Sequence, residues 1–144
     1  MATFVLINDW LANMVENADL ESDQFVVALS NTAPGAESSP PTGDGDGVLA
    51  NVTEVSYTDC STRNITTTSS GQAAGTYSLI LVDLVLTSTG TVGPFRYVYI
   101  YDDTVAAPAD PLVCYYDYGS SITLANGETL TIDFDAANGL FQLS

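Results

Sequence analysis

Beyond its first twenty residues, the sequence consists of short apolar or alternating segments, each ended by a cluster of turn-forming residues. Segments of this length, punctuated by Gly, Pro and Asn, are typical of antiparallel strands in a sandwich or barrel. We therefore predict a mainly β fold, an antiparallel β-sandwich or barrel of about seven to eight short strands. The predicted strands are residues 24–29, 52–57, 63–68, 77–86, 95–101, 112–118, 129–134 and 140–143.

Three segments carry more specific signals. Residues 130–135 alternate apolar and polar side chains, so this strand should have one face in the core and one in water. Asn138-Gly139 suits a tight two-residue turn and predicts that the last two strands form a hairpin. Residues 78–86 are nearly all apolar, which favours a central strand covered on both faces.

The N-terminal segment follows a different pattern. After the apolar residues 3–7, Asn8 or Asp9 can cap a helix that continues to about Asp19. An isolated helix of about ten residues is marginal in water, so it must dock on its own sheet or on a neighbour. The sequence therefore predicts an N-terminal arm and one short helix within residues 1–20. The apolar face of this helix comprises Trp10, Leu11, Met14, Val15 and Ala18.

The length of 144 residues predicts a single β domain, residues 1–144. Residues 31–47 are rich in Pro and Gly and predict a long loop, a feature that is usually functional or flexible. Cys60 and Cys114 lack metal or redox spacing, and two free thiols are favoured over a disulfide. We expect neither a secretory signal nor a membrane-spanning helix, since no apolar run approaches about 20 residues.

The charge excludes several classes of function. The chain has 2 basic and 18 acidic residues and no histidine, giving a net charge of −16. Nucleic acids and anionic membranes should therefore not be partners. Catalysis by histidine is excluded, and we expect no enzyme activity and no catalytic residue. A glycoside hydrolase using two carboxylates is the alternative, although eighteen acids make close pairs non-specific.

Two acidic segments are weak candidates for a cation site. Asp44 and Asp46 alternate with glycines, and Asp102 and Asp103 are adjacent. Calcium takes six to eight oxygen ligands, and the first segment lacks the third acid and the distal Glu of an EF-hand. We therefore expect no metal and no cofactor.

Tyrosines gather on two predicted strands. Tyr97, Tyr99 and Tyr101 share one strand face, and Tyr116 and Tyr118 lie on the next strand. One hypothesis is an aromatic surface that binds protein or sugar, because the tyrosine ring is apolar and its hydroxyl polar. The favoured alternative is packing within the sheet.

Several blocks occur in an order that resembles small structural proteins of tailed bacteriophages. The blocks are FVVALSNT (25–32), LANVTEVSYT (49–58), FRYVYIYDDT (95–104), Pro111-Leu112, DYGSSITL (117–124) and the spaced residues Gly127, Phe134, Gly139 and Leu143. Such proteins are β-rich modules of the virion and are not enzymes.

The resemblance implies a capsid decoration, or cement, protein on the outer surface of the phage head, made in the host cytoplasm. It would stabilise the shell by binding the assembled major capsid protein, and it would itself be a homotrimer. The alternative is a tail or fibre component involved in host recognition or connection.

Two interpretations of the N-terminus stay open at this point. Residues 2–7 can form an apolar arm that adds a strand to a capsid edge, or the first strand of this domain. In the first case the helix would pack on the domain or on a neighbouring protomer. The hypothetical contact residues are Ala2, Thr3, Phe4, Val5, Leu6, Ile7, Trp10, Leu11 and Met14.

Overall fold

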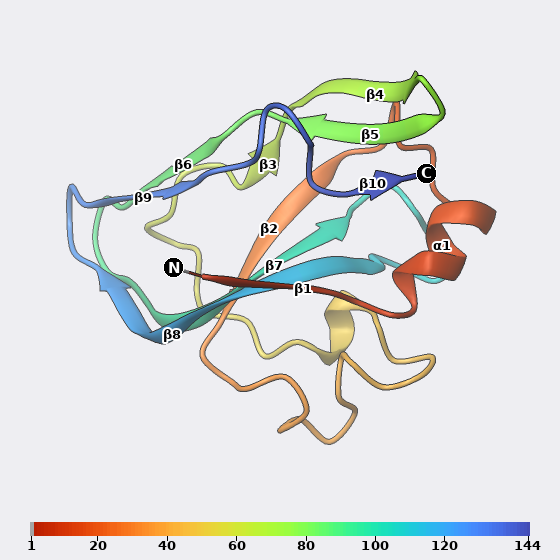
Figure 1. The fold of residues 1–144 in the computed structure, drawn as a ribbon. Helices are drawn as coiled ribbons and strands as arrows, with labels where there is room; N and C mark the ends of the chain where they lie inside the picture. Colours follow the sequence, from red (N-terminus) through yellow and green to blue (C-terminus); the bar gives the residue numbers. More distant parts are fainter. Residues whose placement is uncertain (1) are drawn as a thin grey trace.

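The computed structural model describes residues 2–144, which contain ten strands, one α-helix and one 3-10 helix. The fold is mainly β, with antiparallel sheets in a sandwich-like arrangement, as predicted (Figure 1). The elements are β1 (Thr3–Leu6), α1 (Trp10–Glu16), β2 (Phe25–Ser30), η1 (Leu49–Asn51), β3 (Asn64–Ile65), β4 (Thr67–Ala73), β5 (Thr76–Leu81), β6 (Leu84–Thr87), β7 (Val92–Asp102), β8 (Leu112–Leu124), β9 (Thr129–Ile132) and β10 (Gln142–Leu143).

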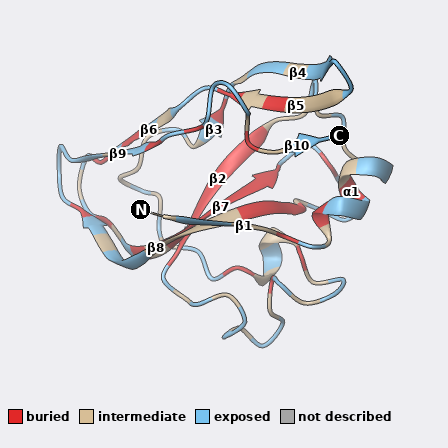
Figure 2. Cartoon of the chain, viewed as in Figure 1, coloured by how far each residue is buried: buried red, intermediate tan, exposed pale blue. Residues whose placement is uncertain are grey.

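The main sheet has five strands in the order β1-β8-β7-β2-β3. Every residue of β2 is buried, and so are the last six residues of β7, from Tyr97 to Asp102. Figure 2 shows this central part of the sheet as the buried region of the molecule. Apolar runs such as Val26–Leu29 therefore lie in strands that are covered on both faces.

One face of the main sheet is covered by strands. A three-stranded sheet, β10-β5-β4, and the pair β6–β9 lie on the same side of the main sheet (Figure 1). We call these five strands the strand layer. Their inward side chains, such as Leu79, Leu86 and Ile132, are buried. The alternation predicted for residues 130–135 is confirmed, because Ile132 and Phe134 are buried between exposed neighbours.

The predicted strand 77–86 is two strands in two sheets, so the prediction of one central strand is wrong. The chain leaves the first sheet at Val82, whose N–H donates to the carbonyl of Thr66. Asp83 then accepts a hydrogen bond of 2.8 Å from the N–H of Phe134. These polar contacts end β5 and redirect the chain into β6, although the run is apolar on either side.

The hairpin predicted at Asn138-Gly139 is also wrong. Strand β9 pairs with β6, and β10 pairs with β5. The Asp135 carboxylate accepts hydrogen bonds from the N–H groups of Ala137 and Asn138 and builds a turn instead. Gly139 has a φ of +80°, and a Cβ there would lie 2.3 Å from the Leu79 carbonyl oxygen, so glycine is required.

The other face of the main sheet is covered by residues 31–57, which we call the loop layer (orange to yellow in Figure 1). Residues 31–47 contain no helix or strand, in agreement with the predicted loop. The predicted strand 52–57 is absent, and the segment makes a single bridge between Ser30 and Glu54. Tyr57 holds it to the sheet, since its hydroxyl accepts from the N–H of Leu29 and donates to Glu54.

The two cysteines are free, as predicted, with Cys114 buried and Cys60 partly buried. The predicted strand 63–68 is divided between β3 and β4, with Thr66 between them. Helix α1 is shorter than predicted and ends at Glu16, because the N–H groups of Asn17 and Ala18 both donate to the carbonyl of Asn13.

Candidate interaction surface

The residues of the apolar face predicted for helix α1 differ in how far they are buried. Trp10 is fully buried and meets Phe25 of β2 edge to face, with ring centroids 6.3 Å apart. Leu11 and Val15 point outward and are 51% and 79% exposed. The buried positions of the helix are Trp10 and Asn13, so the predicted apolar face does not pack as a whole on this domain.

Asp9 does not cap this helix with its side chain. Its carboxylate instead accepts hydrogen bonds from the N–H groups of Gly45 (3.2 Å) and Gly47 (2.8 Å). A Cβ at Gly47 would lie 2.8 Å from that carboxylate, which explains the glycine. The loop of residues 31–47 is thereby tied to the start of α1.

Residues 3–6 are the first strand of this domain, which is the second of the two interpretations of the N-terminus. Strand β1 pairs antiparallel with β8, from Thr3 opposite Asp117 to Leu6 opposite Cys114. It is the outermost strand of the main sheet. Phe4 is 40% exposed and packs edge to face on Tyr116, with ring centroids 5.4 Å apart. Ile7 is buried, and Ala2 and Val5 are partly buried.

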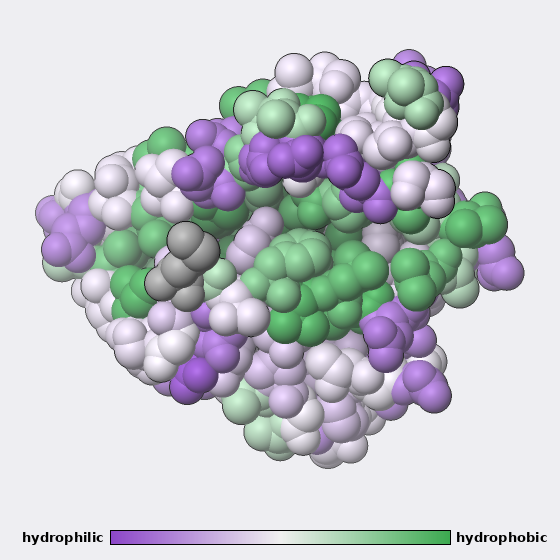
Figure 3. Space-filling model, viewed as in Figure 1, coloured by the Kyte–Doolittle hydropathy of each residue, from purple (hydrophilic) through white to green (hydrophobic). Residues whose placement is uncertain are grey.

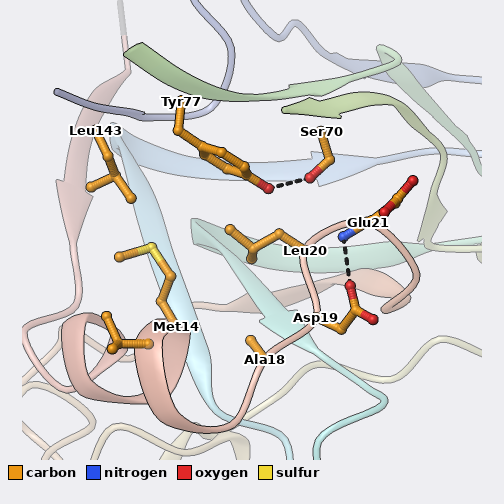
Figure 4. Close-up of a pocket in the computed structure, with 9 residues that line it drawn as sticks. Met14, Ala18, Asp19, Leu20, Glu21, Ser70, Tyr77 and Leu143 are labelled. Carbon is orange, nitrogen blue, oxygen red and sulfur yellow. Dashed lines mark hydrogen bonds between the residues drawn. The ribbon is translucent and has the colours of Figure 1, made fainter. Parts of the chain in front are cut away.

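A groove runs between α1 and β10. Its narrow part is a hollow of about 50 Å³ over Trp10, bordered by Leu6 and Leu143. Its wide part has a volume of about 600 Å³, and Met14 and Leu143 line both parts. In Figure 4, Met14, Leu20 and Tyr77 turn toward a shared space that Leu143 borders. Sequence reasoning identified Met14 but missed Leu20, Tyr77, Phe141 and Leu143, because only the tertiary fold brings β5 and β10 to the helix.

The wide end of the groove is acidic. Asp19 and Glu21 both line it and are both exposed. Hydrogen bonds from the side chain of Ser22 and the backbone of Glu21 lower the pKa of Asp19. This carboxylate is therefore ionised at neutral pH and contributes negative charge to the end of an otherwise apolar groove.

The two basic side chains, Arg63 and Arg96, both make contacts with other residues of the chain. Arg96 makes a bidentate pair with Asp117, with N–O distances of 2.7 and 2.9 Å. Arg63 donates to the carbonyl of Val27, lies 3.7 Å above the ring of Tyr57 and lies 4.0 Å from the Glu54 carboxylate.

The aromatic surface proposed for one strand face does not exist. Tyr97, Tyr99 and Tyr101 are 6%, 0% and 5% exposed and form part of the core beneath the loop layer. Burial raises the pKa of Tyr99 far above its usual value. Tyr116 and Tyr118 are partly exposed and line a hollow of about 330 Å³ together with Ala2 and Asp133.

The candidate cation ligands differ in their surroundings. Among residues 2–144, no three acidic or cysteine side chains are placed to hold a metal ion. Asp44 and Asp46 lie on the loop beside the glycines that bind Asp9, and Asp103 is exposed. Asp102 is fully buried.

Asp102 has a polar environment of its own. Its Oδ1 accepts hydrogen bonds from the N–H groups of Thr104 and Val105, and its Oδ2 is buried with no donor among residues 2–144. Burial, with the neighbouring Asp23 carboxyl, raises the pKa of Asp102 to about 7. A proton shared with Asp23 would satisfy the buried oxygen.

Comparison with protein-family models, curated proteins and solved structures finds no match to this chain. None of the helices within residues 2–144 has the length and apolar character needed to span a bilayer.

Proposed function

We propose that this chain is a structural protein of a tailed-bacteriophage virion, and more specifically a capsid decoration protein. It would bind the assembled major capsid protein on the outside of the head, as a homotrimer, after synthesis in the host cytoplasm. A protein that binds only the assembled shell stabilises that shell by mass action. The resemblance of the ordered sequence blocks to such proteins is the starting point of the proposal.

The observation that carries a binding role is the groove between α1 and β10, which lies beside the outermost strand of the main sheet. Exposed apolar side chains gather there, as expected of a surface that another protein covers. The acidic remainder of the surface would keep free copies soluble and apart.

A non-enzymatic role fits the polar groups of the core. The carboxyl pair of Asp23 and Asp102 would be the natural candidate for acid–base chemistry. Asp102 is fully buried, however, and its Oδ1 is engaged by two backbone N–H groups. A substrate would have no access to this carboxyl, so the pair is better explained as part of the fold.

The alternative function, a tail or fibre component that recognises the host, has one observation in its favour. Tyr116 and Tyr118 border a shallow hollow that also contains Asp133. Aromatic rings beside a carboxylate can bind sugars. The case is weaker than the sequence suggested, since three of the five tyrosines proposed for such a surface are buried.

Locating the chain in purified virions tests both functions. A decoration protein should occur in many copies, with symmetric density on the outer surface of the head by cryo-electron microscopy. A few copies on the tail would support the alternative instead. Absence from the particle, measured by quantitative mass spectrometry, would contradict both.

A further inference from the structure

Among residues 2–144, four of the six large apolar side chains that are exposed lie on one part of the molecule, and the other two, Val82 and Val85, lie outside it. Phe4, Leu11, Val15 and Leu143 are between 39% and 79% exposed and come from β1, α1 and β10. Figure 3 shows the apolar surface that results, between the two layers and out along the helix. Exposed apolar residues of a monomer are normally scattered, so this concentration indicates an interaction site.

The surface is hollowed as well as apolar. The two hollows between α1 and β10 adjoin, because Met14 and Leu143 line both, and together they make up the groove. The fully buried Trp10 lies at its floor, and β1 contributes Leu6 to its narrow end. Apolar side chains of a partner could therefore enter the groove rather than lie flat on it.

Two sheet edges border this groove. Strand β1 is the outermost strand of the main sheet, and β10 is the outermost strand of the three-stranded sheet. Each leaves one side of its backbone without a neighbouring strand among residues 2–144. An extended segment can pair with such an edge and place alternate side chains into an adjoining groove. The geometry therefore favours an extended partner segment over a helix.

The charge of the groove argues against a second copy of this chain as its occupant. Asp19 and Glu21 flank the wide end, and each copy carries a net charge of −16. Both arginines are occupied by internal contacts, so a second copy would bring acids toward acids. A segment with Lys or Arg near its end would complement the acidic rim.

We propose that the groove between α1 and β10, with the free edge of β1, binds an extended apolar segment of another protein that carries a basic residue beside Asp19 and Glu21. This inference takes from the proposed function only the identity of the partner, the capsid protein. The binding chemistry follows from the groove itself and can be tested without a capsid.

The test uses the full chain and a synthetic nine-residue peptide with Val and Leu at alternate positions and Lys at both ends. An otherwise identical peptide with Glu at both ends is the control. Addition of the Lys peptide to the ¹⁵N-labelled chain should shift backbone amide resonances of β1, α1 and β10. The Glu peptide should bind at least tenfold more weakly. Equal binding of the two peptides, shifts elsewhere, or no shift at millimolar peptide would overturn the proposal.

Matched variants locate the contact. Leu11 and Val85 are both 51% exposed, but Val85 lies on β6, away from the groove. Leu11→Gln should weaken peptide binding at least tenfold, and Val85→Thr should leave it within about twofold. Val15→Gln provides a second groove variant, and Glu21→Gln should reduce the preference for the Lys peptide. Equal effects of Leu11→Gln and Val85→Thr, or concentration-dependent self-association through the same amides, would overturn the proposal.

Binding to capsids separates this inference from the proposed function. If capsids bind the wild-type chain and Leu11→Gln equally well, the groove is not the site, although the decoration function stands. If the wild-type chain binds the Lys peptide through the groove but does not bind capsids, the decoration function is wrong and the groove remains a binding site.

Discussion

The two faces of the main sheet are covered in chemically different ways. On the side of the strand layer, aliphatic and aromatic side chains such as Phe25, Leu79 and Trp10 pack together, all fully buried. On the side of the loop layer, the buried side chains include Tyr97, Tyr99 and Tyr101, and polar contacts of partly buried residues hold the layer to the sheet. Arg63, for example, donates to the Val27 carbonyl and stacks on Tyr57.

This difference has an energetic consequence. The strand-layer side is stabilised mainly by apolar area removed from water, so its stability should depend on side-chain volume. The loop-layer side buries polar atoms, and its stability should depend on whether each of them keeps a partner. The Tyr99 hydroxyl and both carboxylate oxygens of Glu37 are buried with no hydrogen-bond partner among residues 2–144. Ordered water is the natural partner for such groups.

The largest effect is expected on the strand-layer side. Phe25→Ala removes a fully buried ring that packs on Trp10 and should lower the free energy of unfolding by about 3–5 kcal/mol. Phe4→Ala, at a position that is 40% exposed, is the control and should cost about 1 kcal/mol or less. Urea denaturation of both variants measures the difference, and equal losses would mean that burial does not set the stability of this side.

Asp102, which pairs in register with Phe25, is a polar exception in this core. Its pKa is raised from 3.8 to about 7, so the folded chain binds the proton more tightly than the unfolded chain. The free energy of unfolding should therefore fall as pH rises from about 4 to about 7, and then level off. Hydrogen bonds lower the pKa of Asp117 and Asp135, so their stabilisation is lost only as pH falls below this window.

Urea unfolding at about pH 4.5 and about pH 7.5 measures this dependence. Asp102→Asn keeps a neutral side chain that can still accept from Thr104 and Val105, and it should remove most of the decrease. Asp103→Asn, at an exposed neighbouring position, should leave the decrease unchanged. An equal pH dependence in the wild-type chain and in Asp102→Asn would show that Asp102 does not cause the decrease.

A smaller effect is expected on the loop-layer side. Arg63→Met keeps the aliphatic stem but removes the hydrogen bond to Val27 and the stacking on Tyr57, and should cost about 1–3 kcal/mol. Arg96→Met breaks the more exposed pair with Asp117 and should cost less. The comparison is made by thermal and urea denaturation. Equal losses would mean that the polar contacts of the loop layer add nothing beyond those of a surface ion pair.

The fold class and the sites differed in how far the sequence could predict them. The alternation of residues 130–135 predicted its strand correctly, because one residue in two must face the core. The apolar run 77–86 predicted a single strand incorrectly. The contacts of Val82 and Asp83 that divide it are made with residues distant in sequence. Asn138-Gly139 did form a turn, but its strands pair with other partners, which local turn chemistry does not specify.

The candidate surface was predictable only in part. Helical periodicity placed Leu11, Met14 and Val15 on one helix face. It did not show that the helix buries Trp10 and Asn13 and leaves Leu11 and Val15 exposed. Strand β10 lines the other side of the groove and lies about 130 residues from the helix in the sequence. No local pattern predicts that these two elements meet.

The smallest effect on stability should come from the groove itself. Val15 is 79% exposed, so Val15→Gln removes little buried area and replaces a β-branched residue by a better helix former. The free energy of unfolding should change by no more than about 0.5 kcal/mol, measured by urea denaturation beside Phe25→Ala. A loss above about 1 kcal/mol would assign Val15 to the packing of the fold and remove the reason to regard it as a binding residue. If Val15→Gln leaves the stability unchanged but abolishes peptide binding, the groove is a third region, distinct from the strand layer and the loop layer. Its apolar side chains then bind a partner and do not stabilise the fold.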